Sequence, residues 1–556
     1  MHLRRFVPAL IVALLATMLT GVAAAAPKLL NDGLPTDASD DDQAIVHSFE
    51  ISPDGRYVVY LAEQMTKGKF ELYSVPTGGG TPIKLNSRLP GGGDVEEGFV
   101  ITPDSTRVVY RADQSSNDLT ELYVVSITGG TPTRLNGPLG ALQDVEPGFS
   151  VSEDSTTVVY RSNENASTVL ELHSAPLSGA GPVTTLNGAL LSGHVGEDFV
   201  ITADSARVVY RAAQDAAGVA ELYSVPLAGG PSEKHSGAFS GSGMVESMKA
   251  SPDGAYVLFI VADDGGRNLY ADSFAGGDPI ALNATPTFAP QTGDYQVSPD
   301  STRVVYLSDQ DVRNRFELYS IPIGGGVAAR KLNGDIKGQV RGFAISEDSR
   351  SVVYRAEQDI SSKTELYFAG IDGGGENPKL NADLTSRGDV HDFAISPDSL
   401  YVVYRADQNR DGKDELFATP IDEEAATRLN RSLAAGGDVL DYAITPDSRR
   451  VVYRADQDTN SQNELYAVSI RGGGAGKLYG DLVRGGDVQP DYEITPDSNR
   501  VVYRADARVN DRYELYSTWA GLRCKGEFAP IVGTSGDNEV VGTSGPDVMV
   551  GLGGDD

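Results

Sequence analysis

The stretch at residues 94–136, DVEEGFVITPDSTRVVYRADQSSNDLTELYVVSITGGTPTRLN, is one copy of a unit that fills most of the chain. Each copy has an aspartate in the same turn, and successive turns lie 47 to 50 residues apart. The ten turn aspartates are Asp54, Asp104, Asp154, Asp204, Asp253, Asp300, Asp348, Asp398, Asp447 and Asp497. Ten copies at nearly constant spacing indicate a repeat architecture.

Each unit divides into four short strands. In the quoted copy, the strands are expected at residues 98–102, 107–112, 121–127 and about 133–135, where β-branched and aromatic residues gather. Pro103-Asp104-Ser105 and Gly129-Gly130 supply turn residues between them. Four strands in about 40–50 residues is the size of one β-propeller blade. The sequence therefore predicts an all-β fold, a β-propeller of ten four-stranded blades. One ten-bladed ring and two five-bladed rings in tandem both fit the strand count.

The fourth strand of each unit ends in Leu-Asn or a weaker form of it, except in the tenth unit. That unit continues through Trp519 to Cys524 without such a strand. A further copy of this fourth-strand signature, Lys28-Leu29-Leu30-Asn31, lies near the N-terminus and belongs to none of the ten units. We therefore expect an N-terminal strand to close the last blade, which would also cover the exposed sheet edges.

The recurring pattern S/T-P-D-S/G, then V-V-Y, then E-L-Y-S, then G-G-x-P-x-K-L-N resembles the TolB-like propeller repeats. The same type of blade occurs in the propeller domains of prolyl-oligopeptidase-type peptidases. The resemblance covers roughly residues 27–520 and implies the propeller fold. It implies no single function, because one fold serves many.

The N-terminus has the pattern of a signal peptide. Arg4 and Arg5 precede an apolar run at 7–19, and small residues follow, with the cleavage site expected near Ala25. We therefore assign residues 1–25 to a signal peptide and expect a secreted, periplasmic or cell-surface protein. No later segment is apolar enough to span a membrane, so we expect no membrane span after cleavage.

The formal net charge is −32, and Cys524 is the only cysteine. So acidic a surface repels nucleic acid and anionic membranes, and it favours cations or basic partners. We therefore expect no nucleic-acid partner. A single cysteine excludes an internal disulfide framework, so stability has to come from packing, with bound metal as a further contribution.

Seven units pair an arginine near the end of the second strand with a glutamate at the start of the third. The pairs are Arg111/Glu121, Arg161/Glu171, Arg211/Glu221, Arg355/Glu365, Arg405/Glu415, Arg454/Glu464 and Arg504/Glu514. Across a hairpin, such residues are expected to form an ion pair. Seven copies favour a scaffold role over a catalytic one.

The loop between those strands is acidic, and in the eighth unit it reads D-x-N-x-D-G from Asp407. Asp407, Asn409 and Asp411 alternate as oxygen ligands do at the start of an EF-hand calcium loop. A hydrated hairpin loop without metal is the alternative. A further aspartate precedes the first strand of several units, at Asp94, Asp144, Asp389, Asp438 and Asp487. These could form a carboxylate ring around one channel mouth, or each could cap its own turn.

A tail at 533–556 follows a linker at 521–532 and repeats every nine residues. It reads GTSGDNEVV, GTSGPDVMV and GLGGDD. This resembles the calcium-binding nonapeptide repeats of RTX proteins. The resemblance implies Ca²⁺ ligands at Asp547 and Asp556, with Asn538 standing where the pattern has another aspartate. Only two full repeats are present, so the tail is expected to be either a truncated stack or mostly disordered.

Enzyme signatures are missing: there is no G-x-S-x-G, no H-E-x-x-H and no phosphate-binding glycine loop. We therefore assign no catalytic and no organic cofactor-binding residue. The leading hypothesis is a monomeric, exported binding or scaffold module for a protein or glycan ligand. The alternative is a propeller enzyme with one channel site, such as a lyase, a lactonase or a glycan-active enzyme. The divergent fifth unit, with Asp263, Asp264 and Arg267, is the first place to look for that site.

Overall fold

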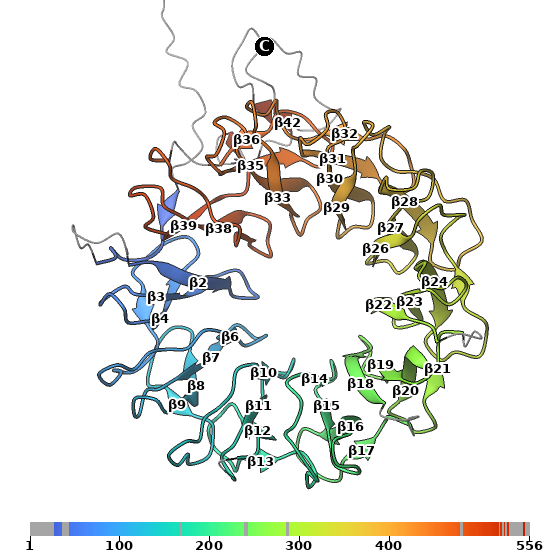
Figure 1. The fold of residues 1–556 in the computed structure, drawn as a ribbon. Helices are drawn as coiled ribbons and strands as arrows, with labels where there is room; N and C mark the ends of the chain where they lie inside the picture. The colour runs from blue at the N-terminus through green and yellow to red at the C-terminus, as the bar shows by residue number, and fades with distance from the viewer. Residues whose placement is uncertain are drawn as a thin grey trace, which may run out of the picture.

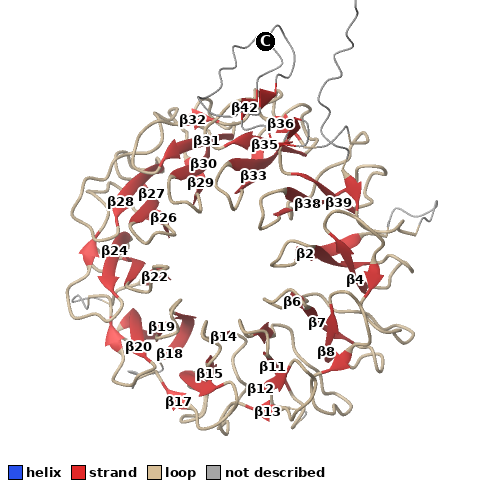
Figure 2. Ribbon diagram, turned by 180° about the vertical axis from the view of Figure 1, so that it is seen from behind, coloured by secondary structure: helices blue, strands red, loops and turns tan. Residues whose placement is uncertain are grey.

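The computed structural model describes residues 27–35, 44–166, 168–237, 243–284, 289–478 and 482–521, and four short strands beyond. All its regular elements are β-strands. They form ten radial sheets around one central channel, so the chain is a single ten-bladed ring rather than two five-bladed ones (Figure 1). The view from behind shows the same closed circle (Figure 2).

Blades are numbered here from the N-terminus, and each contributes one strand to the channel wall. These innermost strands are β2 (Val46–Ile51), β6 (Val100–Ile101), β10 (Ser150–Val151), β14 (Phe199–Ile201), β18 (Met244–Ala250), β22 (Thr292–Val297), β26 (Val340–Ile345), β29 (Val390–Ile395), β33 (Val439–Ile444) and β37 (Glu493–Ile494). The second strands are β3 (Tyr57–Ala62), β7 (Arg107–Ala112), β11 (Thr157–Ser162), β15 (Arg207–Ala212), β19 (Tyr256–Asp263), β23 (Arg303–Ser308), β27 (Ser351–Ala356), β30 (Tyr401–Ala406), β34 (Arg450–Ala455) and β38 (Arg500–Ala505).

The outer half of each blade consists of a long third strand and a two-residue fourth strand. The third strands are β4 (Glu71–Pro76), β8 (Glu121–Ser126), β12 (Glu171–Pro176), β16 (Glu221–Pro226), β20 (Gly266–Ser273), β24 (Glu317–Pro322), β28 (Glu365–Gly370), β31 (Glu415–Pro420), β35 (Glu464–Ser469) and β39 (Glu514–Trp519). The fourth strands are β5 (Ile83–Lys84), β9 (Thr133–Arg134), β13 (Thr184–Thr185), β17 (Glu233–Lys234), β21 (Ile280–Ala281), β25 (Arg330–Lys331), β32 (Thr427–Arg428) and β36 (Gly476–Lys477). In blade 7 a single bridge between Tyr367 and Lys379 takes this place.

The N-terminal strand β1 (Lys28–Leu29) is the fourth strand of blade 10. It runs antiparallel to β39, with Lys28 opposite Ser517 and Leu29 opposite Tyr516. The Asn31 side chain accepts a hydrogen bond of 2.8 Å from the Leu515 amide. The predicted closure of the ring by the N-terminus is therefore confirmed.

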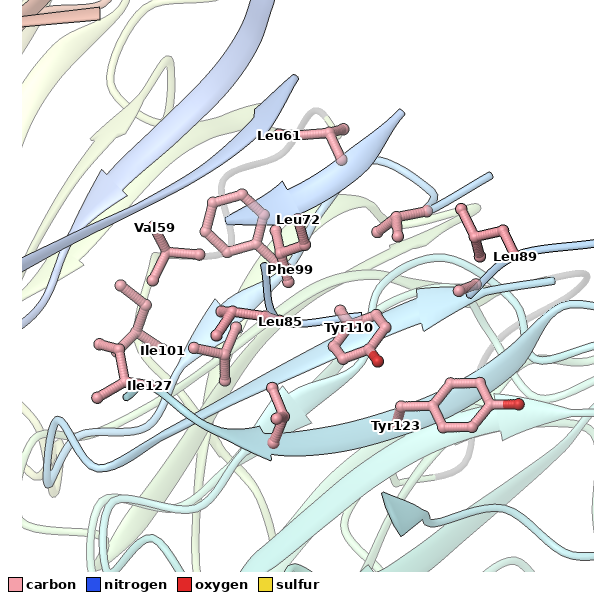
Figure 3. Packing of buried hydrophobic residues seen from close by; sticks show 14 residues of the cluster. Val59, Leu61, Leu72, Leu85, Leu89, Phe99, Ile101, Tyr110, Tyr123 and Ile127 are labelled. Carbon is pink, nitrogen blue, oxygen red and sulfur yellow. The ribbon is translucent and has the colours of Figure 1, made fainter. Parts of the chain in front are cut away.

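The core lies between neighbouring blades rather than at the centre of the ring. Between blades 1 and 2, Val59, Leu72 and Leu85 pack against Phe99 and Tyr110 (Figure 3). Within blade 2, the rings of Tyr110 and Tyr123 stack with centroids 5.7 Å apart. Equivalent stacks recur around the ring, which explains why V-V-Y and E-L-Y repeat: their alternate residues face the two adjacent blades.

The strand register overturns the predicted ion pair between the repeated arginine and glutamate. In blade 2, Arg111 lies opposite Leu122, and Glu121 lies opposite Ala112. The two charged side chains therefore point to opposite faces of the sheet.

The arginine instead joins two blades, since Arg111 Nη1 donates to the main-chain oxygen of Val145 at 3.1 Å. The other six arginines make the same bond, to Val195, Val245, Val390, Val439, Val488 and Val46. Glu121 binds within its own blade, to Arg134 of the fourth strand at 2.7 Å and to the Tyr123 hydroxyl. Both residues are scaffold, as predicted, but through different partners.

Beyond blade 10, four two-residue strands are described: β40 (Arg523–Cys524), β41 (Glu527–Phe528), β42 (Ile531–Val532) and β43 (Met549–Val550). β40 and β41 form an antiparallel pair, and β42 and β43 a parallel one. The predicted signal peptide lies outside the described residues. Among the residues that are described, no helix is long and apolar enough to cross a membrane.

Candidate functional site on the loop face

One face of the ring carries the loops from second to third strands and those leading into each first strand. We call it the loop face, and the opposite one the turn face. Both predicted groups of aspartates on the blades lie on the loop face. The channel wall between the two faces holds a further acidic group, which is separate from those on the loop face.

The loop-face aspartates hydrogen-bond to main-chain amides within and between blades. Asp456 accepts from the amides of Asp438 at 2.6 Å and Ser461 at 2.9 Å, which joins two loops of blade 9. Asp438 in turn accepts from the Asp414 amide of blade 8 at 2.8 Å. Asp94, Asp144, Asp389 and Asp487 each accept an amide of the preceding blade in the same way. These carboxylates therefore join blades, and burial raises the pKa values of Asp438 and Asp487.

The predicted calcium residues of blade 8 follow this scaffold pattern. Asp407 accepts from the amides of Asp389 at 2.6 Å and Gly412 at 3.0 Å. The Asn409 amide group donates to Glu415 at 2.6 Å, and Asp411 accepts from the Arg387 amide at 3.3 Å. The three side chains thus turn to different partners. Within the residues that the structure describes, no three His, Cys, Asp or Glu side chains are placed to hold a metal ion.

A histidine lies beside that loop. His391 Nε2 is 3.0 Å from Asp414 Oδ1 and 3.6 Å from Asp407 Oδ1. The hydrogen bond with Asp414 raises the pKa of His391, against the effect of partial burial. This pair joins the first strand of blade 8 to its acidic loop, and sequence spacing alone does not bring the two residues together.

A pair of glutamates on the channel wall was not identified in the sequence analysis. Glu493 of β37 accepts a hydrogen bond of 2.9 Å from the amide of Ile51 in β2, so its carboxylate spans the junction of blades 10 and 1. Burial, and then the charge of Asp491, raise the pKa of Glu493 to about 7. Burial, and then the charge of Glu493, also raise the pKa of Glu50 to about 7, but the Glu50 side chain is exposed to solvent, so Glu493 is the more strongly perturbed of the two. Two neighbouring carboxyl groups with such pKa values can share protons near neutral pH.

The signal for these glutamates is a break in the repeat. The residue after the first-strand aromatic is small, apolar or neutral in most blades, and only blades 1 and 10 have glutamate there. Lys249 and Gln296 occupy the same position in blades 5 and 6. Both reach the next blade, through the main-chain oxygens of Tyr295 at 2.6 Å and Phe343 at 3.1 Å.

The three charged residues singled out in the fifth unit form no common site. Asp263 ends β19 opposite Gly266, and its side chain accepts from the Gly265 amide at 2.8 Å. Arg267 pairs with Glu246 at 2.7 Å. Asp264 lies in the tight turn between β19 and β20, so the three residues serve one hairpin and its neighbour.

The predicted tail ligands Asn538, Asp547 and Asp556 lie outside the described residues. Two described strands of this region, β42 and β43, show how it pairs. β42 and β43 pair in parallel with Ile531 opposite Met549 and Val532 opposite Val550. The partners are 18 residues apart in sequence, which is twice the nine-residue period.

No family model matches the chain, and no curated protein matches it. Among solved structures, a putative TolB from Agrobacterium tumefaciens is similar at 18% identity, covering 50% of this chain and 91% of its own, with a TM-score of 0.27. An oligogalacturonate lyase in complex with manganese is similar at 16% identity, covering 58% and 87%, with a TM-score of 0.33. A dipeptidyl peptidase 4 from Porphyromonas gingivalis is similar at 11% identity, covering 75% and 65%, with a TM-score of 0.45. These likenesses concern the propeller fold alone.

Proposed function

We propose that the chain is an exported, non-catalytic propeller that binds a protein or glycan ligand at the cell envelope or outside the cell. The main support for this proposal is the set of contacts that the recurring polar side chains make. The repeated arginines, glutamates and loop aspartates all bond within the scaffold, so their repetition needs no catalytic explanation. The pattern of residues 1–25 supports export.

The loop face is the proposed binding surface. Corresponding loop tips differ between blades and expose Met65, Val312, Ile360 and Val509. Variable side chains on loops held by a rigid scaffold are typical of binding surfaces. A direct test is capture from envelope extracts on immobilised full chain. Recovery of a partner that is lost when these four residues are changed together to serine supports the proposal, and recovery of nothing specific contradicts it.

We propose calcium as a ligand of the tail, through Asp547 and Asp556 with Asn538 beside them. The parallel pairing of β42 and β43 at twice the repeat period supports this, because calcium binds between successive coils in such repeats. Calorimetric titration of the full chain, and of the chain ending at residue 530, tests it. Heat that persists without the tail would place calcium on a blade loop, where Asp407→Asn is the matching variant.

The second candidate is an enzyme with one channel site, favoured by Glu50 and Glu493. Two carboxyl groups with pKa values near 7 are suited to proton transfer. Turnover on a panel of glycans and lactones that is abolished in Glu493→Gln would establish this candidate. A lack of turnover in the native protein across the panel would count against it.

A further inference from the structure

A serine in the turn between first and second strands adopts a left-handed backbone in eight blades. Its φ lies between 56° and 61° at Ser105, Ser155, Ser205, Ser301, Ser349, Ser399, Ser448 and Ser498. This conformation costs a residue with a Cβ about 1–2 kcal/mol, whereas glycine adopts it freely. The serine hydroxyl must therefore provide a compensating contact.

That contact is a hydrogen bond between blades. The Asp398 amide of blade 8 donates to Ser448 Oγ of blade 9 at 2.9 Å. All eight serines accept an amide of the preceding blade in this way. We call this bond the serine staple. The aspartate bond between blades on the loop face, as made by Asp438, is the aspartate staple.

Two interfaces lack both staples. Gly55 and Gly254 stand where the other eight blades have the serine, and Ile45 and Met244 stand at the position of the aspartate, which His194, Gln291 and Gln339 occupy in blades 4, 6 and 7. The interfaces concerned are those between blades 10 and 1 and between blades 4 and 5. The first is where the N-terminal segment meets blade 10. It is reinforced by β1, by the bond that Glu493 accepts from the Ile51 amide, and by a bond that Arg512 donates to the Leu34 oxygen at 2.6 Å.

Between blades 4 and 5, the outer contacts of the described residues are made by one aromatic side chain: Arg207 lies over the Phe274 ring at 5.8 Å, and the His235 ring meets that ring edge-on at 5.1 Å. The arginine bond from Arg211 to Val245 remains, at 2.8 Å. The amide of Val245 bonds to the Ala220 oxygen at 3.2 Å, compared with 2.9 Å for the equivalent bond from Val439 to Asp414.

Its interior holds a histidine and an aspartate, where the other interfaces have a leucine and an apolar residue or a threonine. His235 replaces the leucine of the Leu-Asn signature, and Asp272 replaces a third-strand valine. His235 lies 2.7 Å from Asp272 Oδ2 through Nδ1 and 2.7 Å from Ser224 Oγ through Nε2. The three side chains are arranged as in a Ser-His-Asp catalytic triad, but Ser224 is 0% exposed and cannot contact a substrate. A buried polar cluster stabilises an interface less than well-packed apolar side chains do.

We propose that the ring opens between blades 4 and 5. The closed circle becomes one C-shaped arc that runs from blade 5 through blades 10 and 1 to blade 4. The chain between β17 and β18 still connects the two ends of this arc. The junction of blades 10 and 1 stays closed, because β1 is paired in blade 10 and the chain continues from it into blade 1.

Hydrogen exchange of the full chain tests this, with the Val245 and Val439 amides as equivalent reporters of the two interfaces. Because the interface between blades 4 and 5 lacks the hydrogen bonds of both staples, we predict that the Val245 amide exchanges about tenfold faster than the Val439 amide. Gly254→Ser introduces the hydroxyl of a serine staple on a backbone that already has the required φ of 69°, and the Asp204 side chain shifts slightly because the new Cβ lies 3.2 Å from Asp204 Cγ. This variant should slow Val245 exchange, whereas Gly254→Ala, which adds no hydroxyl, should not.

The reverse experiment removes both staples from an intact interface. In Asp438→Ala/Ser448→Ala, Val439 should exchange about as fast as native Val245. Equal exchange of Val245 and Val439 in the native protein would overturn the proposal. Equal slowing by Gly254→Ser and Gly254→Ala would overturn the role of the staple.

Discussion

Arg504 Nη1 donates a hydrogen bond of 2.9 Å to the main-chain oxygen of Val46, which precedes it by 458 residues. The same bond joins Arg454 to Val488 inside the ring, at 3.3 Å. The junction of the chain ends therefore repeats a contact used between consecutive blades. In both places the arginine also pairs with an aspartate of its own blade, Asp491 just before β37 or Asp441 in β33.

Replacing Arg504 should weaken the closed ring. Hydrogen bonds to a charged group contribute about 1.5–3 kcal/mol, so Arg504→Ala should lower the free energy of unfolding by an amount in this range. Denaturant unfolding measures it, with Arg454→Ala as the matched control at an internal interface. An unchanged unfolding midpoint for Arg504→Ala would show that closure does not depend on this contact.

Asn31→Ala should release the N-terminal strand. The side chain satisfies the Leu515 amide, and leaving a buried donor without a partner costs about 1–3 kcal/mol. Asn86 makes the equivalent bond to Leu72 at 2.9 Å within one continuous blade, so Asn86→Ala is the control. Only the Asn31 variant should speed hydrogen exchange in β39. Equal exchange of β39 in the two variants would contradict the assignment.

The buried pair His235 and Asp272 should show strong coupling in a double-mutant cycle. Asp272→Val alone leaves the histidine buried without its partner, and His235→Leu alone leaves the carboxylate, so each should destabilise by about 3–5 kcal/mol. The double variant restores the residues of other interfaces and should be at least as stable as the native protein. Additive losses in thermal unfolding would refute the coupling.

The channel glutamates should make stability fall with rising pH. Their folded pKa values of about 7 lie above the ordinary glutamate pKa of 4.5. Their contribution is therefore complete below pH 4.5 and disappears as the pH rises through 7. Glu493→Gln should reduce the loss of thermal stability between pH 5.5 and 8.5.

The control for that measurement is Glu357→Gln in blade 7. Burial would raise the pKa of Glu357, but hydrogen bonds from Arg341 and Ser362 outweigh it and lower the pKa. A depressed carboxyl pKa affects stability only in acid, so this variant should leave the slope between pH 5.5 and 8.5 unchanged. A native slope retained in Glu493→Gln would exclude the glutamate as its origin.

The blades and their closure could be predicted because each depends on local signals repeated ten times. The second strand of the quoted unit was expected at 107–112 and is β7 with those bounds. The first was expected at 98–102, but only Val100–Ile101 pairs regularly. Gly98 adopts a φ of 82°, which an extended strand does not accommodate.

The partners of the charged residues could not be predicted from spacing. Arg111 and Glu121 are close in sequence, yet the hairpin register places them on opposite faces, where other blades decide their contacts. The glutamates at 50 and 493 are distant in sequence, and only ring closure brings them together. Both cases depend on tertiary geometry, whereas the blade pattern depends on local periodicity.

Closure by β1 also sets an order of events in folding. Lys28 pairs with Ser517, so the first strand of the propeller has to wait for nearly the last one. During synthesis from the N-terminus, β1 has no partner until blade 10 is made. The entropic cost of closing so large a loop grows only slowly with its length, but contacts distant in sequence form late. The final step of folding is thus the capture of the N-terminal segment, which makes the completed ring a check that the whole propeller has been made.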